Sequence, residues 1–344
     1  MTTSDILLVF DKTVTPAGVE GWMRHLESAN APTDVYRLGT THVLSVSDVD
    51  LIHRGGPVLP EPTHQVLWNT DVWLGRRELR PGGTVVSFGT TTIGDGSVAV
   101  IAGPCAVESP EQTHATAAFV AEHGAVGLRG GVFKPRTSPH SFQGLQWDGL
   151  DLLAEAGERT GLPVVTEVVD PEHVKRLAAV VDGFQIGARN MQNFALLTAV
   201  GQSGLPVVLK RGFGCTMEET LAAAEYLLVE GNDQVVLCER GIRTFEPSAR
   251  FTLDLTAVAL WKQRTHLPVM VDPSHSGGLP ELVEPLSLAA VAAGADALLI
   301  DVHVAPEKAL CDGNQALRPQ QFADLMTRLA PMVAGLGRHM SSGG

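Results

Sequence analysis

The chain has 344 residues, of which 44% are hydrophobic and 18% charged, and its formal net charge is -13 at pH 7. Such a chain can bury a large core, and its acidic balance excludes a general nucleic-acid-binding surface or an anionic-membrane surface, because the summed field repels both. The four cysteines lack the paired spacing of a metal finger and are too few for a disulfide scaffold, and no run of about twenty apolar residues is present. We expect a protein of the reducing cytoplasm.

The first 80 residues predict a small α+β domain. Residues 6–10 are strand-like and residues 17–28 are helix-like, and residues 35–46 offer two extended runs around Gly39. We place the domain at residues 1–80.

A linker is expected at residues 81–96. Within it, residues 84–95 predict a hairpin that turns at residues 94–96, where Gly94 and Gly96 flank Asp95. Such a hairpin can close the N-terminal end of a following barrel.

From about residue 97 onward, short runs rich in valine and isoleucine alternate with amphipathic stretches, which indicates eight strand-helix units. The expected strands are residues 98–103, 125–129, 163–168, 183–187, 206–210, 234–239, 268–272 and 297–302. Eight parallel strands close into a (β/α)8 TIM barrel of about 250 residues. We place it at residues 97–338, followed by a flexible tail at residues 339–344. A doubly wound open sheet is the alternative.

Polar residues follow these strands one after another, where barrels carry their active sites. In chain order they are Cys105, Arg129, Glu167, Arg189, Lys210, Arg240, Asp272 with His275, and Asp301 with His303. A second cluster, at residues 134–139 (Lys-Pro-Arg-Thr-Ser-Pro), combines two cations and two hydroxyls with two prolines that restrict the backbone. Long cationic side chains from several strands predict a site for one or more anions.

A second constellation predicts a metal site. Cys105, His275, Asp301 and Asp312 would bring one sulfur, one imidazole and two carboxylates to the same end of the barrel. The thiolate argues against magnesium and leaves manganese, iron, cobalt or zinc open.

These residues resemble a known family. The motifs are Ile-Ala-Gly-Pro-Cys at residues 101–105, Lys-Pro-Arg-Thr-Ser at 134–138, Ile-Gly-Ala-Arg-Asn at 186–190, Cys-Glu-Arg-Gly at 238–241 and Val-Asp-Pro-Ser-His-Ser at 271–276. They resemble 3-deoxy-D-arabino-heptulosonate 7-phosphate (DAHP) synthase, type I-beta, which has a ferredoxin-like N-terminal domain. The resemblance runs from about residue 98 to residue 336 and is much weaker over residues 1–80.

The resemblance implies condensation of phosphoenolpyruvate with erythrose 4-phosphate to DAHP and phosphate, the first step of the shikimate pathway to aromatic amino acids. By similarity, Arg129 and Lys134 hold the phosphoenolpyruvate carboxylate, with Lys210 nearby, and Arg189, Lys210 and Arg240 hold its phosphate. Arg136 and Thr137 hold the aldose phosphate, and Asp272 joins the substrate site. The expected catalytic residues are Lys134 as proton donor, with Glu167 or His275 assisting the water. A homotetramer and an aromatic amino acid effector are also family expectations.

Several alternatives stay open. The family usually has glutamate where this chain has Asp301, so metal affinity or preference is expected to change. Cys311 stands beside Asp312 and, under air, is a candidate to pair with Cys105 when metal is removed. The rival enzyme is 3-deoxy-manno-octulosonate 8-phosphate synthase, which typically carries Lys-Ala-Asn-Arg-Ser at the 134–138 segment, and the rival class is a non-catalytic paralogue that binds a phosphorylated metabolite. The small domain either docks over the active-site mouth as a regulator or serves only assembly.

Overall fold

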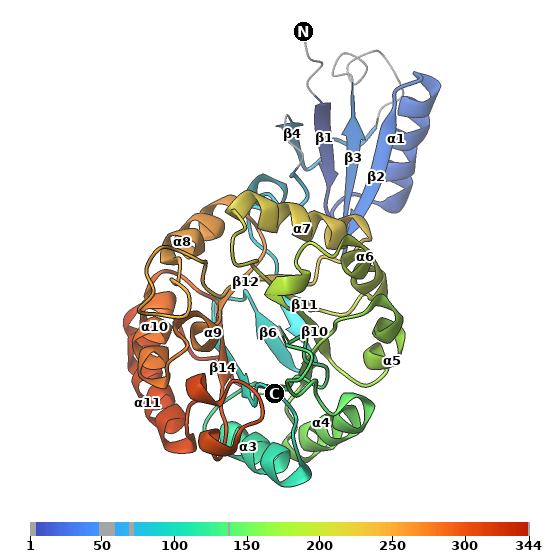
Figure 1. Cartoon of the computed structure of the whole chain (residues 1–344). Helices are drawn as coiled ribbons and strands as arrows, with labels where there is room; N and C mark the ends of the chain where they lie inside the picture. Colours follow the sequence, from blue (N-terminus) through green and yellow to red (C-terminus); the bar gives the residue numbers. More distant parts are fainter. Residues whose placement is uncertain (1–4, 48–58, 69–71, 137, 343–344) are drawn as a thin grey trace.

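The chain forms a closed barrel with a small sheet domain beyond one side of it (Figure 1). This computed structural model describes residues 5–47, 59–68, 72–136 and 138–342. Eight parallel strands, in the order β10-β11-β12-β13-β14-β7-β8-β9, close the barrel. The predicted TIM barrel is confirmed, and closure of the sheet rules out the doubly wound alternative.

All eight predicted strands are present, each within two residues of its expected bounds. They are β7 (Ala99–Gly103), β8 (Gly127–Arg129), β9 (Val164–Glu167), β10 (Gly183–Ile186), β11 (Val207–Lys210), β12 (Val235–Glu239), β13 (Val269–Val271) and β14 (Ala297–Asp301). The predicted tail begins with hydrogen-bonded residues, since the Val98 amide donates to the His339 carbonyl and the Ser341 amide donates to the Val98 carbonyl, each at 2.9 Å.

Helices connect the strands and begin where the sequence supplies a cap. The Ser109 hydroxyl accepts a hydrogen bond from the Gln112 amide before α3, and Thr216 with Glu219 forms a capping box before α7. The helices are α3 (Pro110–Glu122), α4 (Gln146–Thr160), α5 (Val174–Ala178), α6 (Phe194–Ser203), α7 (Met217–Val229), α8 (Leu255–Arg264), α9 (Pro273–Gly277), α10 (Pro280–Ala292) and α11 (Pro319–Gly335).

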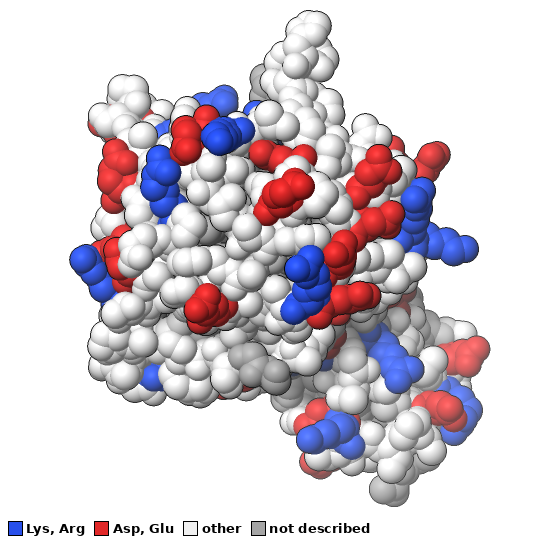
Figure 2. Space-filling model, turned by 90° about the horizontal axis from the view of Figure 1, so that it is seen from below, with Lys and Arg blue, Asp and Glu red and all other residues white. Residues whose placement is uncertain are grey.

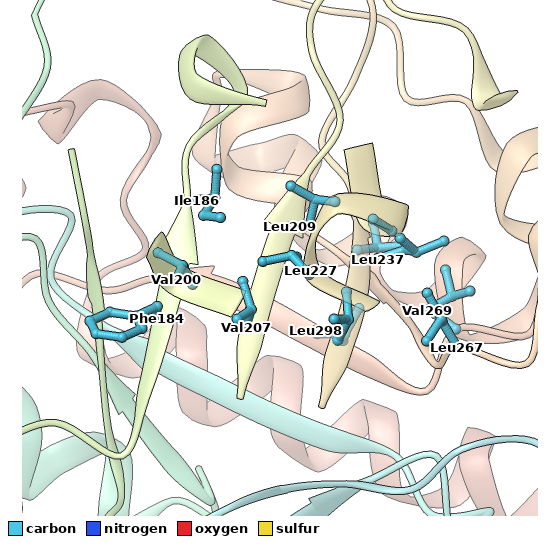
Figure 3. Packing of buried hydrophobic residues seen from close by; sticks show 14 of the residues in the cluster. Phe184, Ile186, Val200, Val207, Leu209, Leu227, Leu237, Leu267, Val269 and Leu298 are labelled. Carbon is cyan, nitrogen blue, oxygen red and sulfur yellow. The ribbon is translucent and has the colours of Figure 1, made fainter. Parts of the chain in front are cut away.

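The main core lies between the strands and the ring of helices. Figure 3 shows Val207 and Leu209 of β11 near Val200 of α6 and Leu227 of α7, and all four side chains are fully buried. Each such side chain contributes about 1.5–3 kcal/mol by leaving water. The strands are buried on both faces, by the helices outside and by the barrel interior, which explains the near-continuous apolar runs in the sequence.

A hairpin closes the N-terminal end of the barrel, as predicted. It consists of β5 (Val86–Phe88) and β6 (Thr91–Ile93), and its apolar side chains pack with inward-facing barrel residues such as Val208 and Met270. The predicted turn position was wrong. The chain turns at Gly89, whose φ of 53° suits a two-residue hairpin turn, whereas residues 94–96 follow the hairpin.

The small domain has an antiparallel sheet in the order β2-β3-β1-β4. This is the strand order of the ferredoxin-like βαββαβ arrangement. Its elements are β1 (Asp5–Phe10), α1 (Pro16–Ser28), β2 (Thr33–Leu38), β3 (Thr41–Val46) and β4 (His64–Trp68). The connection between β3 and β4 contains residues 48–58, which lie outside the described part.

The small domain and its linker meet the barrel around the end of α7 and the start of β12. Arg80 lies 2.8 Å from the Asp233 carboxylate, and its guanidinium also donates to the Leu38 carbonyl of β2. The Glu225 carboxylate of α7 accepts three backbone N–H bonds, of 2.9–3.1 Å, from residues 73–75. Since β12 begins here, the described part of the small domain lies near the barrel end opposite the strand C-termini, away from the mouth.

The surface carries both signs of charge. Figure 2 shows lysine and arginine side chains close to aspartate and glutamate on the face it presents. In the part of the chain that the structure describes, no helix is both long and apolar enough to cross a membrane.

Candidate active site

Ionic side chains meet inside the barrel where its strands end. Each is at most 7% exposed, and they are Arg129 of β8, Glu167 of β9, Lys210 of β11, Asp272 directly after β13 and Asp301 of β14. Below them the interior is apolar. Buried charges are tolerated only when paired. Arg129 lies 3.0 Å from Asp301, Lys210 lies 2.5 Å from Asp272, and Glu167 lies 3.4 Å from Lys134. Their position at the strand C-termini is that of a barrel active site.

A cavity of about 230 Å³ opens at this end. Eight of the predicted site residues line it, namely Lys134, Arg136, Glu167, Arg189, Lys210, Arg240, His275 and Asp312. Four others, Cys105, Arg129, Asp272 and Asp301, are buried and lie outside its lining. Thr137 lies outside the described residues.

Three predicted metal ligands converge on one point. The Cys105 sulfur lies 3.7 Å from Nε2 of His275 and 3.5 Å from Oδ2 of Asp312, and the last two atoms are 3.7 Å apart. Ligand atoms at normal bond lengths from a tetrahedral ion lie about 3.3–3.8 Å from one another. The sulfur, nitrogen and oxygen donors therefore fit a divalent transition metal.

Asp312 is ready to bind a cation, whereas Cys105 must first lose a proton. Burial opposes ionisation of Asp312, but the charges of His275 and Arg250 outweigh it and lower the pKa of Asp312 to about 2. A hydrogen bond with Cys311 and burial both raise the pKa of the Cys105 thiol. Because a metal binds the thiolate, its entry would displace that proton.

Asp301 has a different environment from the other three. Its Oδ1 lies 3.0 Å from the guanidinium of Arg129, and its Oδ2 accepts a 2.7 Å hydrogen bond from the Gln315 amide. Oδ2 also lies 3.5 Å from Nδ1 of His275, on the other side of the ring from Cys105. The predicted fourth ligand stays within reach of the site, since Asp301, Cys105 and His275 offer donor atoms within 4.8 Å of one another, but Arg129 and Gln315 already contact its carboxylate.

Asp272 fixes the orientation of His275. Its carboxylate accepts the His275 amide at 2.8 Å and lies 2.9 Å from Nδ1 of the imidazole. It also lies 2.5 Å from the Lys210 ammonium. Burial opposes protonation of His275, but the charges of Asp272 and Asp301 outweigh it and raise the pKa of the imidazole. The aspartate holds Nε2 toward Cys105 and Asp312, as carboxylate partners of metal-binding histidines do.

The cations that line the cavity differ in their partners. Lys134 lies 3.4 Å from the Glu167 carboxylate. Arg240 donates to the His275 carbonyl at 3.1 Å and lies over the rings of Phe213 and Phe251, while its Nη1 atom is buried without a hydrogen-bond partner. Burial lowers the pKa of Arg240 to about 10. An anion in the cavity would supply the missing partner.

The model of the "DAHP synthetase I family" matches residues 80–334. The chain belongs to this family. It is 49% identical over 264 residues, 77% of this chain and 78% of the relative, to the phospho-2-dehydro-3-deoxyheptonate aldolase of Thermotoga maritima. It is 34% identical over 260 residues, 69% of this chain and 91% of the relative, to the 2-dehydro-3-deoxyphosphooctonate aldolase of Desulfosudis oleivorans.

Solved structures of the DAHP synthetase I family extend the similarity. A crystal structure of the Thermotoga maritima phospho-2-dehydro-3-deoxyheptonate aldolase (DAHP synthase) matches with a TM-score of 0.77 and 41% identity, covering 98% of this chain and 99% of that one. A truncated form of the 3-deoxy-D-arabino-heptulosonate 7-phosphate synthase from the same organism matches with a TM-score of 0.74 and 46% identity, covering 79% of this chain and 100% of that one. The resemblance to DAHP synthase is confirmed over both the barrel and the small domain.

Three residues of this family member's site were not predicted. Arg250 lines the cavity, donates to the Gln315 amide oxygen at 2.5 Å and lies 3.9 Å from Asp312. Gln315 in turn holds Asp301, and Glu108 contacts the loop that carries Asp312. Arg250 lies eleven residues after the end of β12, and Gln315 lies fourteen residues after the end of β14, so neither could be selected as a residue at a strand end. The one available signal was the proximity of Gln315 to Asp312 in sequence.

Proposed function

We propose that this member of the DAHP synthetase I family condenses phosphoenolpyruvate with D-erythrose 4-phosphate to DAHP and inorganic phosphate. The observation that carries the proposal is the cavity, where cations from four segments of the barrel surround the His275 and Asp312 donors. Two phosphates and a carboxylate repel one another unless several cations hold them together. The identity of 49% to a heptonate aldolase, against 34% to an octonate aldolase, favours the four-carbon aldose.

We assign the phosphoenolpyruvate end to four cations, of which Lys134, Lys210 and Arg240 are buried and Arg189 is exposed. Arg189, Lys210 and Arg240 would hold its phosphate, and Lys134 its carboxylate. Arg129 could also contact the phosphoenolpyruvate carboxylate, but its guanidinium already forms an ion pair with Asp301. Arg136 and Thr137 would hold the aldose phosphate. Bidentate guanidinium contacts fix the two substrates in a reactive orientation, which lowers the barrier without a covalent intermediate on the protein.

The proposed reaction forms one carbon–carbon bond. C3 of phosphoenolpyruvate attacks the aldehyde carbon, the aldehyde oxygen gains a proton, hydroxide from water adds at C2, and phosphate leaves with its bridging oxygen. A divalent ion held by Cys105, His275 and Asp312, with Asp301 beside them, would polarise the aldehyde oxygen. Glu167, which lines the cavity, would accept the proton of the water. Lys134 is the candidate donor to the aldehyde oxygen.

The environment of Lys134 qualifies its role as a donor. Burial opposes its protonation, but negative charge at Cys105 and Glu167 raises the pKa of the ammonium above its ordinary value. The side chain therefore stays protonated, and it is a weak acid while Glu167 accompanies it. Protonation of Glu167 by the attacking water would remove that charge and make Lys134 a better donor.

We also propose a cytoplasmic homo-oligomer, a tetramer by family resemblance, which uses manganese, iron, cobalt or zinc. The four free cysteines support a reducing compartment, and the sulfur donor supports a transition metal over magnesium. An aromatic amino acid is the proposed effector of the small domain. If deletion of residues 1–80 left inhibition by tyrosine or phenylalanine intact, this effector role would be wrong. A solved truncated relative supports the use of such a deletion.

The test of the activity is phosphate release from phosphoenolpyruvate with erythrose 4-phosphate or with arabinose 5-phosphate. Each sugar is assayed with chelator and with added manganese. We expect metal-dependent release with the four-carbon sugar alone. Release with the five-carbon sugar would transfer the chain to the octulosonate reaction, and release with neither would favour a non-catalytic phosphometabolite-binding protein.

A further inference from the structure

The loop that supplies Asp312 is the long connection between β14 and α11. It follows β14, and its base is closed by a bridge between Val302 and Leu317. Asp312 itself has left-handed backbone angles, with φ of 52° and ψ of 30°. A residue other than glycine in this conformation costs about 1–2 kcal/mol, so surrounding contacts must hold it there.

Glu108 provides those contacts directly before Asp312. Its Oε1 accepts backbone N–H bonds from Leu310 at 2.9 Å and from Cys311 at 3.2 Å. Its Oε2 lies 3.4 Å from Nε2 of His303. Nδ1 of His303 accepts the Ala305 amide at 3.0 Å, so Nε2 carries the proton and donates to the carboxylate. One buried carboxylate thus receives three donors from the β14–α11 connection.

Glu108 belongs to the segment that also carries Cys105. That segment is fixed on the next strand, because the Val107 amide donates to the Gly131 carbonyl at 3.0 Å and the Gly131 amide donates to the Cys105 carbonyl at 3.2 Å. The segment between β7 and α3 therefore carries the candidate ligand Cys105. Through Glu108 it also holds the loop that carries the candidate ligand Asp312. The separation of 3.5 Å between the Cys105 sulfur and the Asp312 oxygen depends on this arrangement.

We propose that Glu108 is a positioning residue that sets Asp312 against Cys105 and His275 for metal binding. The inference rests on the proposed metal site and extends it to a residue outside the ligand set. Glu108 does not line the cavity, so it acts through Asp312 and not on the substrates. Partners of this kind typically change metal affinity by about 10- to 100-fold when they are removed.

The test measures manganese affinity of the full chain directly, by the electron paramagnetic resonance signal of free Mn²⁺, without turnover. We expect Glu108→Ala to weaken binding by about 10- to 100-fold and Glu108→Gln, which keeps one acceptor oxygen, by less. Glu111→Gln is the matched control, because Glu111 lies on the same segment, three residues further, and is exposed. The affinity of each variant for phosphoenolpyruvate is measured by thermal shift in the presence of chelator. It should stay within about twofold of the wild-type affinity, whereas a general loss of structure would weaken it further.

A double-mutant cycle separates positioning from folding. In an Asp312→Asn background, Glu108→Ala should weaken manganese binding by less than about threefold, since its target is already removed. Amide exchange of residues 310–311 should rise in Glu108→Ala. Equal manganese affinity of wild type and Glu108→Ala would overturn the positioning role while leaving the metal site intact. A wild type that binds no manganese, iron, cobalt or zinc would overturn the metal site and this inference together.

Discussion

Two buried arginines on neighbouring strand ends allow a sharp test of which charges serve stability and which serve binding. Arg211 is fully paired, lying 2.9 Å from Glu239 and 3.0 Å from Asp254. Among the described residues, no carboxylate forms an ion pair with Arg240, and one of its terminal nitrogens lacks a hydrogen-bond partner. We predict opposite outcomes when each is replaced by methionine, which keeps the apolar stem.

The magnitude for Arg240 follows from its pKa. Burial lowers that pKa from its ordinary value to about 10, and each pKa unit corresponds to about 1.4 kcal/mol, so the ionised side chain costs about 3 kcal/mol relative to an arginine in water. Because the folded pKa lies below the unfolded one, this cost is present throughout neutral pH and fades only as the pH rises above about 10. Lost contacts with Phe213 and Phe251 offset about 0.5–2 kcal/mol of the gain. Arg240→Met should therefore raise the free energy of unfolding by about 1–2.5 kcal/mol.

Binding should respond in the other direction. Loss of charged hydrogen bonds to a phosphate costs about 1.5–3 kcal/mol, which predicts that phosphoenolpyruvate binds about 10- to 150-fold more weakly to Arg240→Met. Arg211→Met should instead lower the free energy of unfolding by about 3–5 kcal/mol, because it leaves the buried Glu239 carboxylate without its ion-pair partner. Thermal unfolding of each variant with and without phosphoenolpyruvate measures both effects. A destabilised Arg240→Met that keeps the full phosphoenolpyruvate-induced shift in Tm would refute the reasoning.

Three further predictions concern single contacts. Asp301→Glu restores the longer arm and should tighten manganese binding by about tenfold in a direct titration, and indistinguishable affinity and selectivity would rule out any effect of the shorter side chain. Since the sulfurs of Cys105 and Cys311 lie 3.6 Å apart, aerobic metal removal should lower the number of free thiols from four to two. The thiols are counted after unfolding in denaturant, because three of the four cysteines are buried, and an unchanged count would exclude the pairing. Burial raises the pKa of Glu225 to about 7. As the pH rises from about 5 to 8, the free energy of unfolding of the wild type should therefore fall by up to about 3 kcal/mol relative to that of Glu225→Gln. Parallel pH profiles of Tm for the two proteins would contradict this.

The barrel was predictable because strand periodicity and strand-end chemistry are local properties. A buried parallel strand is a short continuous apolar run, and the residue after it faces the active site whatever the rest of the chain does. Lys210 and Glu167 could therefore be selected from their neighbours alone. The hairpin turn was misplaced because residues 94–96 and Gly89 all carry turn signals, and only strand pairing decides between them.

The supporting contacts were not predictable, since they join loops that are distant in the sequence. Glu108 meets Cys311 across 203 residues, and Arg250 meets Gln315 across 65. Composition and spacing carry no signal for such pairs. Asp301 is an example of a residue whose contacts the sequence does not indicate. The sequence marks it as a shorter arm at a ligand position, but only the structure shows that Arg129 and Gln315 occupy its carboxylate.

A chain with a net charge of -13 nevertheless builds a cationic cavity. Six lysine or arginine side chains line it against two carboxylates, a surplus of four positive charges. The other acids of the site, Asp272 and Asp301, are buried outside the lining, where they pair with Lys210 and Arg129. Two phosphorylated substrates, one of them also a carboxylate, bring about four to five negative charges at neutral pH. In the metal-loaded site the ion adds two positive charges and the Cys105 thiolate one negative charge, while His275 is neutral as a ligand. The surplus is then five positive charges, which balances both substrates.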